Sequence, residues 1–266
     1  NKMGRCRYLS RLIRIMFFVA FTAFSAIAAD DGFLQVTGPC RLSFPADHGP
    51  HKDYRTEWWY YTGNLTDGDN RRFGFQLTFF RSGLQAPDKR REWPDPASAW
   101  RTDQIYLAHA AVSDIGGGRH LQAERMARPV LSLAGADQVG GTVTIHIHDW
   151  QAVIAPEAHR LQASADAFAL SLDLTPDKPV VLHGDSGYSR KGQSPERASC
   201  YYSFTRLQAS GSLSVNGARY EVQGSAWMDH EFSTAPLQPG ITGWDWFSLQ
   251  LSDRTEIMIF LLRQPD

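Results

Sequence analysis

The segment Trp227-Met228-Asp229-His230-Glu231 places two carboxylates among aromatic and imidazole side chains. If this segment is a strand, alternation puts Trp227, Asp229 and Glu231 on one side and the other two residues on the opposite side. A carboxyl held against aromatic walls loses hydration, which raises its pKa and keeps part of it protonated near neutrality. Asp229 is therefore the candidate catalytic acid.

A second acid, Glu57, stands directly before Trp58-Trp59-Tyr60. If Glu57 faces the same cavity as Asp229, it is a second catalytic carboxyl or it positions a water molecule. The alternative for Asp229 and Glu231 is structural, with both carboxylates paired to arginines or capping a turn.

Aromatic side chains near these acids are the candidates for ligand binding. Trp59, Tyr202 and Trp227 carry large π faces, and Glu231 is expected on the same strand face as Asp229. These four residues complete the predicted site around the two acids.

Two histidines and one loop could add to the site. His109 lies between alanines on an apolar strand, where a hydrogen-bonded core histidine is the alternative to a ligand contact. His183 opens a polar segment, residues 184–192, that could form a lid over a barrel mouth and contribute Tyr188. A solvated hairpin loop is the alternative for this segment.

No metal or cofactor is expected. His146 and His148 alternate on one strand face and are followed by Asp149, but no further ligand stands at a standard zinc spacing. The sequence also lacks a phosphate loop, a dinucleotide fingerprint and the nucleophile elbow of the α/β-hydrolases.

Short β segments separated by turn residues must position these side chains. The strong alternation of residues 72–80, after the Asp67-Gly68 turn, predicts a hairpin with the segment that follows Glu57. Further strands are expected at residues 104–112, 141–149, 151–155, 160–163, 167–174, 200–207, 211–215, 219–228, 244–251 and 255–263. No segment has a convincing helical period over three turns, and residues 120–138 come closest only weakly.

This density of short strands predicts an all-β fold, an antiparallel barrel or sandwich. Phe73, Phe75, Leu77 and Phe79 share one strand face, and the face of Asp229 mixes aromatic rings with carboxylates. Such faces suit the lining of a barrel that holds a ligand.

Residues 1–28 have the pattern of a secretory signal peptide. Five cations precede an apolar run, and Ala26-Ile27-Ala28 is a small-x-small cleavage site. The apolar run is shorter than the ~20 residues that a membrane span needs, so no integral membrane protein is expected after cleavage. The predicted location is periplasmic or secreted.

Cleavage would also change the charge of the chain. It removes five of 27 cations and leaves 22 against 28 acids, which argues against nucleic acid as a partner. Of the three cysteines, Cys40 and Cys200 would remain, and an oxidising compartment could join them.

Four segments, taken together and in order, resemble the lipocalin-like family of carotenoid 1,2-hydratase (hydroxyneurosporene synthase, CrtC), including its exported AttH-like branch. They are residues 44–60, 106–109, 183–192 and 226–232. The resemblance implies two tandem lipocalin-like barrels. The first would span residues 43–232 after an irregular segment, 29–42, and the second would start within residues 233–266 and be truncated.

The resemblance also implies a structural role for one aromatic residue. First strands of lipocalins commonly carry a tryptophan that closes the barrel floor against an arginine. Trp59 with Arg55 or Arg206 could do the same here.

As an activity, the resemblance implies that a C=C bond of an acyclic isoprenoid is hydrated. Asp229 would protonate the alkene, aromatic π faces would steady the tertiary cation at about 0.5–2 kcal/mol each, and water would add. The alternative is a non-catalytic periplasmic carrier that holds an apolar small molecule and exchanges it with an ABC-type transporter.

Overall fold

The computed structural model describes residues 32–94, 96, 98–235 and 240–264. Contacts divide the chain into residues 1–30 and one compact unit, residues 31–266. The predicted signal peptide lies outside the described residues. In the part of the chain that is described, no helix is long and apolar enough to cross a membrane.

The barrel wall and the C-terminal hairpin are built from strands of two to 18 residues. In chain order they are β1 (Thr56–Asp67), β2 (Arg72–Gly83), β3 (Gln104–Asp114), β4 (Arg119–Ala127), β5 (Ala134–Val139), β6 (Thr142–Ile147), β7 (Trp150–Ile154), β8 (His159–Ala165), β9 (Phe168–Pro176), β10 (Val181–Leu182), β11 (Tyr188–Arg190), β12 (Ala198–Val215), β13 (Ala218–Ser233), β14 (Gly243–Gln250) and β15 (Glu256–Arg263). Of two 3-10 turns in the described residues, η1 (Ala46–His48) precedes β1 and η2 (Pro87–Glu92) lies between β2 and β3.

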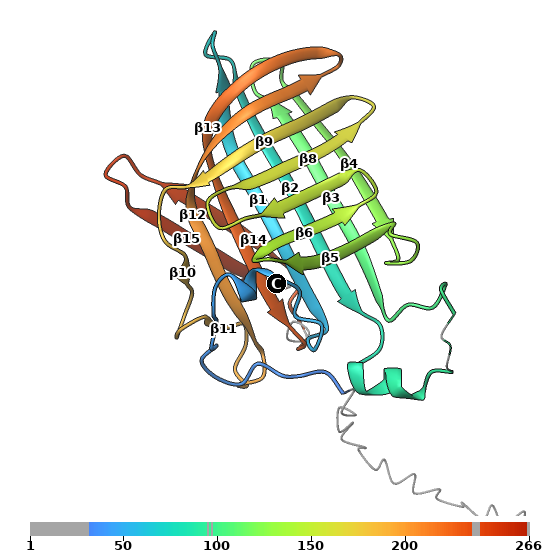
Figure 1. Cartoon of the computed structure of the whole chain (residues 1–266). Coiled ribbons are helices and arrows are strands. Elements are labelled where there is room, and N and C mark those ends of the chain that lie inside the picture. Colours follow the sequence, from blue (N-terminus) through green and yellow to red (C-terminus); the bar gives the residue numbers. More distant parts are fainter. Residues whose placement is uncertain (1–31, 95, 97, 236–239, 265–266) are drawn as a thin grey trace, which may run out of the picture. The chain divides into compact units, whose positions relative to one another are not determined.

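One antiparallel sheet forms a nearly closed barrel. Its strand order is β4-β3-β2-β1-β13-β12-β9-β8-β7-β6-β5, and β10 and β11 pair with β12. Strands β5 to β9 cross over β1 to β4, and β6 approaches both β3 and β4 (Figure 1). The predicted all-β, antiparallel, lipocalin-like barrel is thus confirmed.

The interior is filled by side chains that alternate along the strands. Phe73, Phe75, Leu77 and Phe79 are at most 3% exposed and belong to the main hydrophobic cluster, as their period-2 pattern predicted. Trp150, from the opposite wall, is fully buried in the same cluster. Burial of these rings is the main stabilising term of the barrel.

A tight turn and one bulge set the register of the long hairpin β12–β13. Asn216 and Gly217 both have positive φ, as a two-residue hairpin loop requires. The pairing then shifts between Phe204 and Leu207. A shift of one residue exchanges the two faces of a strand. The bulge therefore decides which side chains of β12 before Leu207 face outward.

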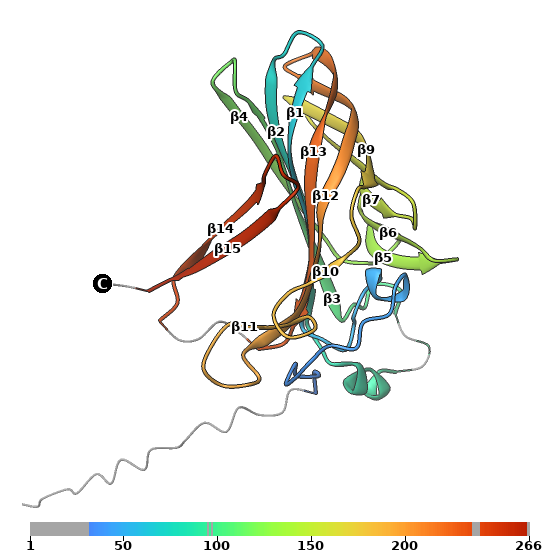
Figure 2. The same cartoon turned by 90° about the vertical axis from the view of Figure 1, so that its left-hand side faces the viewer.

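Strands β14 and β15 form a separate two-stranded sheet beside the barrel wall (Figure 2). Glu256 connects it to the barrel through Arg206 Nε at 2.7 Å and Lys178 Nζ at 2.5 Å. Gln250 Nε2 also donates to the carbonyl of Thr205 in β12 and to that of Ala226 in β13. This sheet begins where the second barrel was predicted, and the tandem arrangement itself stays a prediction.

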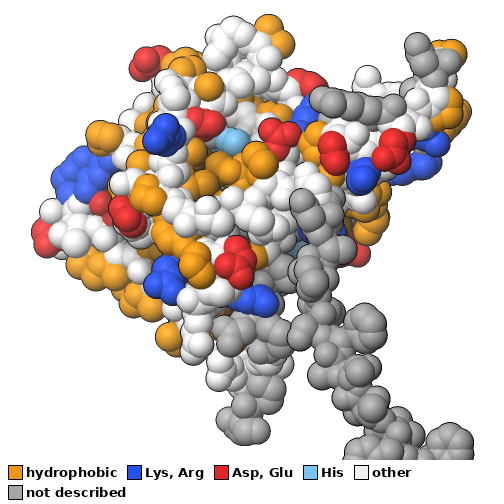
Figure 3. All heavy atoms as spheres, turned by 90° about the horizontal axis from the view of Figure 1, so that it is seen from below, with side chains coloured by type: hydrophobic (Ala, Val, Ile, Leu, Met, Phe, Trp, Pro, Cys, Tyr) orange, Lys and Arg blue, Asp and Glu red, His pale blue; other side chains and the backbone are white. Residues whose placement is uncertain are grey.

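The segment before β1, residues 32–55, covers one end of the barrel. A disulfide between Cys40 and Cys200 ties it to β12, so the sequence's candidate pair is formed in the structure. Seen from this end, hydrophobic side chains lie among acidic and basic ones (Figure 3).

Two sequence expectations differ from the structure. No strand was predicted within residues 120–138, which supply most of β4 and β5. The strands expected at 200–207 and 211–215 are one continuous strand, β12, because the bulge lets it bend without breaking. The described residues between β2 and β3 form a loop that contains the turn η2.

Candidate functional site

The wall formed by β1 and β13 carries the predicted acids on two different faces. Glu57 shares its face of β1 with Trp59, an interior residue. Asp229 lies opposite Tyr60 on the outer face, and alternation puts Glu231 on that same face. The two predicted catalytic carboxyls therefore do not line one cavity, and Glu57 does not pair with Asp229.

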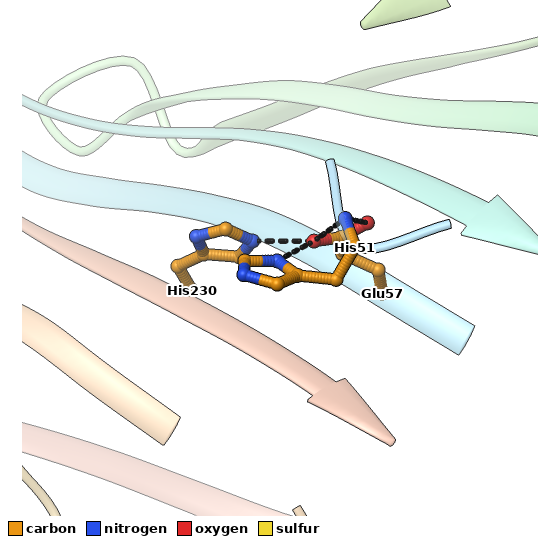
Figure 4. A group of neighbouring side chains, drawn as sticks. All are labelled: His51, Glu57 and His230. Atoms are coloured by element: carbon orange, nitrogen blue, oxygen red, sulfur yellow. Dashed lines mark hydrogen bonds and ion pairs between the residues drawn. The ribbon is translucent and has the colours of Figure 1, made fainter. Parts of the chain in front are cut away.

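On the interior face, Glu57 is fully buried and gathers several donors (Figure 4). Its Oε1 lies 2.8 Å from His51 Nδ1 and 2.8 Å from His230 Nε2. Arg81 Nε donates to Oε2, also at 2.8 Å. Burial alone would raise the pKa of Glu57, but the hydrogen bonds from His230 and His51 and the charge of Arg81 hold it far below its usual range.

His51 is held between two carboxylates. Its Nε2 lies 3.0 Å from Asp47 Oδ1, and its Nδ1 contacts Glu57. Both ring nitrogens must donate, so His51 is an imidazolium. Burial opposes this charge, but the hydrogen bonds to Asp47 and Glu57 outweigh it and raise the pKa of His51 to about 9.

The network continues through a tyrosine to a third histidine. The hydroxyl of Tyr202 lies 2.8 Å from His230 Nδ1 and 2.7 Å from His48 Nδ1. Burial lowers the pKa of His48 to about 4, so this ring is neutral at pH 7. One arrangement is consistent with the contacts between these side chains: His48 donates to Tyr202, Tyr202 to His230, and His230 to Glu57.

Among the described residues, His51, Glu57 and His230 form a group that could hold a metal ion, since one ligand atom from each lies within 4.8 Å of the others. Imidazole and carboxylate ligands suit zinc. However, His51 Nδ1 and His230 Nε2 each lie at hydrogen-bond distance from Glu57 Oε1. Each nitrogen donates a proton to this oxygen, so neither contact lacks a donor or an acceptor. The geometry fits a proton-linked network better than a metal centre.

The same network closes the barrel end. The indole of Trp59 stacks on the ring of His230, with centroids 4.7 Å apart. Arg81 donates to two carbonyls of the segment before β1. The arginine that joins this network is Arg81, and not Arg55 or Arg206 as the resemblance implied: Arg55 lies over Phe33, and Arg206 pairs with the hairpin.

On the outer face, Asp229 is the centre of a second polar cluster. It is 4% exposed, and its Oδ1 accepts hydrogen bonds from the hydroxyl of Ser203 and from Trp227 Nε1, the latter at 2.6 Å. Ser203 in turn lies 2.6 Å from His183 Nε2. Tyr201 adds a further hydrogen bond to Asp229.

Burial controls the charge of this carboxyl. Desolvation raises the pKa of Asp229 to about 7, although the bonds from Ser203, Trp227 and Tyr201 each favour the ionised form. The charge of Glu231 adds to the rise. A large fraction of Asp229 therefore carries a proton near neutrality, as the aromatic surroundings predicted.

Aromatic rings from the hairpin β14–β15 cover the cluster. Trp246 lies edge-on to Tyr60, with centroids 5.3 Å apart, and to Trp227 at 6.0 Å. Its Nε1 donates to the hydroxyl of Tyr201 at 3.3 Å. Asp229 is thus enclosed by rings from β1, β12, β13 and β14.

The segment after β9 contributes to the outer cluster, although not through the predicted residue. Lys191 Nζ lies 3.0 Å from Glu231 Oε1 and 4.4 Å from the centroid of Phe260 in β15. His183 comes from the same segment. Tyr188 instead donates to the carbonyl of Pro195 in its own loop.

The remaining predicted residues lie apart from both clusters. His109 faces outward on β3, half-exposed, and its Nε2 lies 3.8 Å from Glu124. His148 occupies a turn with positive φ, His146 Nε2 contacts the carbonyl of Ser132, and Asp149 pairs with Arg125. These two histidines and Asp149 do not converge on one point.

The sequence did not indicate four members of the outer cluster: Ser203, Tyr60, Tyr201 and Trp246. Tyr60 and Ser203 are the direct cross-strand partners of Asp229, in β1 and β12. A predicted β1–β13 pairing could have indicated Tyr60. Ser203 depends on the bulge in β12, and Trp246 on the packing of a second sheet, neither of which has a local signal.

Two comparisons with known proteins identify the family. The profile of the AttH-like family matches residues 35–266. The crystal structure of a candidate AttH (NE1406) from Nitrosomonas europaea is 36% identical, with a TM-score of 0.76 over 87% of this chain and 68% of that chain. Kievitone hydratase from Nectria haematococca, at 12% identity and a TM-score of 0.58, covers the same shares and shows a similar fold. Among curated proteins, none matches.

Proposed function

Because this chain belongs to the AttH-like family, we propose that it hydrates a C=C bond of an apolar, isoprenoid-like ligand, with Asp229 as the general acid. The ligand lies at the outer face of the β1–β13 wall, under the hairpin β14–β15. The observation that supports this proposal is that the carboxyl of Asp229 is buried among aromatic rings and that its pKa is raised to about 7. A general acid works best when its pKa is near the operating pH.

The outer face has the groups that alkene protonation needs. Protonated Asp229 transfers its proton to one alkene carbon, and the positive charge forms on the other. Trp227, Tyr60 and Trp246 surround this position, and each π face stabilises a cation by about 0.5–2 kcal/mol. Water then adds to the cation and loses a proton, which gives the alcohol.

The interior network of Glu57, His51 and His230 has a structural role and does not contact the ligand. Trp59 and Tyr202, which were predicted to contact ligand, face the interior and bond to the segment before β1: Trp59 donates to the carbonyl of His48, and Tyr202 accepts from His48 Nδ1. They position the wall on whose other side Asp229 stands. Glu57 acts with them by holding the barrel end closed.

The test is a hydration assay on the full chain. Wild type and Asp229→Asn are incubated with neurosporene in ¹⁸O-labelled water, and the product is analysed by mass spectrometry. We expect a labelled alcohol from wild type and a loss of about 10²–10⁴ in rate for Asp229→Asn. Asp173→Asn, an exposed aspartate of β9 paired with Arg160, is the matched control and keeps full activity.

An inactive wild type, or equal rates for wild type and Asp229→Asn, would contradict the proposal. Tight binding of neurosporene without product in either protein would favour the carrier, which holds an apolar ligand and exchanges it with an ABC-type transporter. The proposed export of the chain suits both functions.

A further inference from the structure

A line of hydrogen bonds joins Asp229 to the surface of the protein. Asp229 Oδ1 accepts from the hydroxyl of Ser203, and Ser203 Oγ lies 2.6 Å from His183 Nε2. Ser203 is fully buried, whereas His183 is partly exposed between the exposed residues Leu182 and Gly184. The acid is thus two hydrogen bonds away from a side chain that reaches solvent.

We propose that His183 and Ser203 form a proton relay that returns a proton from solvent to Asp229 after each transfer. This inference rests on the proposed function of Asp229 as an acid. Ser203 and His183 are positioning residues in this reaction, because they act on the substrate only through Asp229.

The proton movements balance in one concerted step. His183 takes a proton from solvent at Nδ1 and releases the one at Nε2 to Ser203 Oγ. The Ser203 hydroxyl proton passes at the same time to Asp229 Oδ1. His183 and Ser203 end neutral, the carboxylate becomes the acid, and the proton lost by the attacking water replaces the one taken from solvent.

The surroundings of His183 favour its neutral form, so the ring can carry a proton only transiently. Its ring lies tilted over Tyr201, with centroids 4.1 Å apart. Burial and the charge of Lys191 lower the pKa of His183 to about 4, so the neutral ring is the resting form. The other titratable groups that face this line are Tyr60 from β1 and Glu231 from β13.

The direct test needs no substrate. After a rapid pH jump across neutrality, time-resolved infrared spectroscopy follows the carboxylic C=O band of Asp229, identified by its absence in Asp229→Asn. In His183→Gln the amide keeps a hydrogen bond to Ser203 but cannot take up and release a proton near neutrality, so protonation of Asp229 slows by about tenfold or more. Ser203→Ala, which breaks the line at its centre, slows it to a similar degree.

A chemical rescue separates a relay from a merely structural contact. In His183→Ala, added imidazole restores the fast protonation of Asp229, because it occupies the space left by the ring. His120→Gln is the matched control, since His120 also bonds a serine, Ser113, but on the exposed surface of β4. Unchanged rates in His183→Gln and Ser203→Ala, or slow rates that imidazole does not restore, overturn the relay.

Turnover distinguishes failure of the relay from failure of the function. With neurosporene, His183→Gln is expected to complete one fast turnover from the protonated acid and then to slow, which appears as a burst of product. A steady rate equal to that of wild type contradicts the relay and leaves Asp229 as the acid. No product from wild type contradicts the proposed function, while the infrared result still decides the relay.

Discussion

Replacement of Glu57 by Gln should be among the most destabilising changes in this protein. Glu57 is fully buried and accepts hydrogen bonds at 2.8 Å from Arg81, His51 and His230. The amide removes the negative charge and leaves Arg81 and the His51 imidazolium without their common partner. Removal of one partner of a buried ion pair costs about 3–5 kcal/mol.

Urea unfolding of wild type and Glu57→Gln measures this cost. For a chain of this size the same loss lowers Tm by about 6–20 °C. Glu221→Gln is the control, because its ion pair with Arg219 is exposed on both sides and its loss should cost less than about 1 kcal/mol. A Glu57→Gln variant within about 1 kcal/mol of wild type would refute the charge assignment of the interior network.

Three further changes follow from the structure. Because the pKa of His51 is raised to about 9 from 6.5, its stabilisation is complete below pH 6.5 and lost as pH rises through 9. Unfolding free energy should fall over that range in wild type and stay flatter in His51→Gln; equal slopes would contradict this. Replacement of Cys40 and Cys200 by Ala removes a disulfide that joins residues with a sequence separation of 160. The free energy of unfolding in urea should fall by about 2–5 kcal/mol, and an unchanged midpoint would show that the disulfide contributes nothing to stability. Trp246→Ala lets water reach Asp229, so the pKa of that carboxyl should move back towards 3.8 in infrared titration, and a pKa that stays near 7 would show that the hairpin does not control it.

Much of the barrel could be predicted because its signals are local. The alternation of Phe73 to Phe79 and the Asn216-Gly217 turn specify strands and a hairpin without knowledge of any distant contact. The strands β4 and β5 lack such a pattern, since β4 is half-exposed along its whole length and β5 is only six residues long.

The site was harder to predict because it depends on register. Alternation correctly separated Asp229 from His230, but it cannot tell which face of β13 is the interior. That choice is made by the packing of Trp59 and Met228 in the core and by the hairpin β14–β15 outside. For this reason the sequence pattern allowed Glu57 and Asp229 to line one cavity, whereas in the structure they lie on opposite faces of the sheet.

The ionisation of Asp229 is the property on which the proposed function depends. Infrared difference spectra between wild type and Asp229→Asn, recorded from pH 4 to 9, isolate the C=O stretch of this one carboxylic acid. We expect the band to be present at low pH and to disappear with a midpoint at about 7. A midpoint near the ordinary value of 3.8 would show that Asp229 is a carboxylate at neutral pH and would contradict its role as the acid.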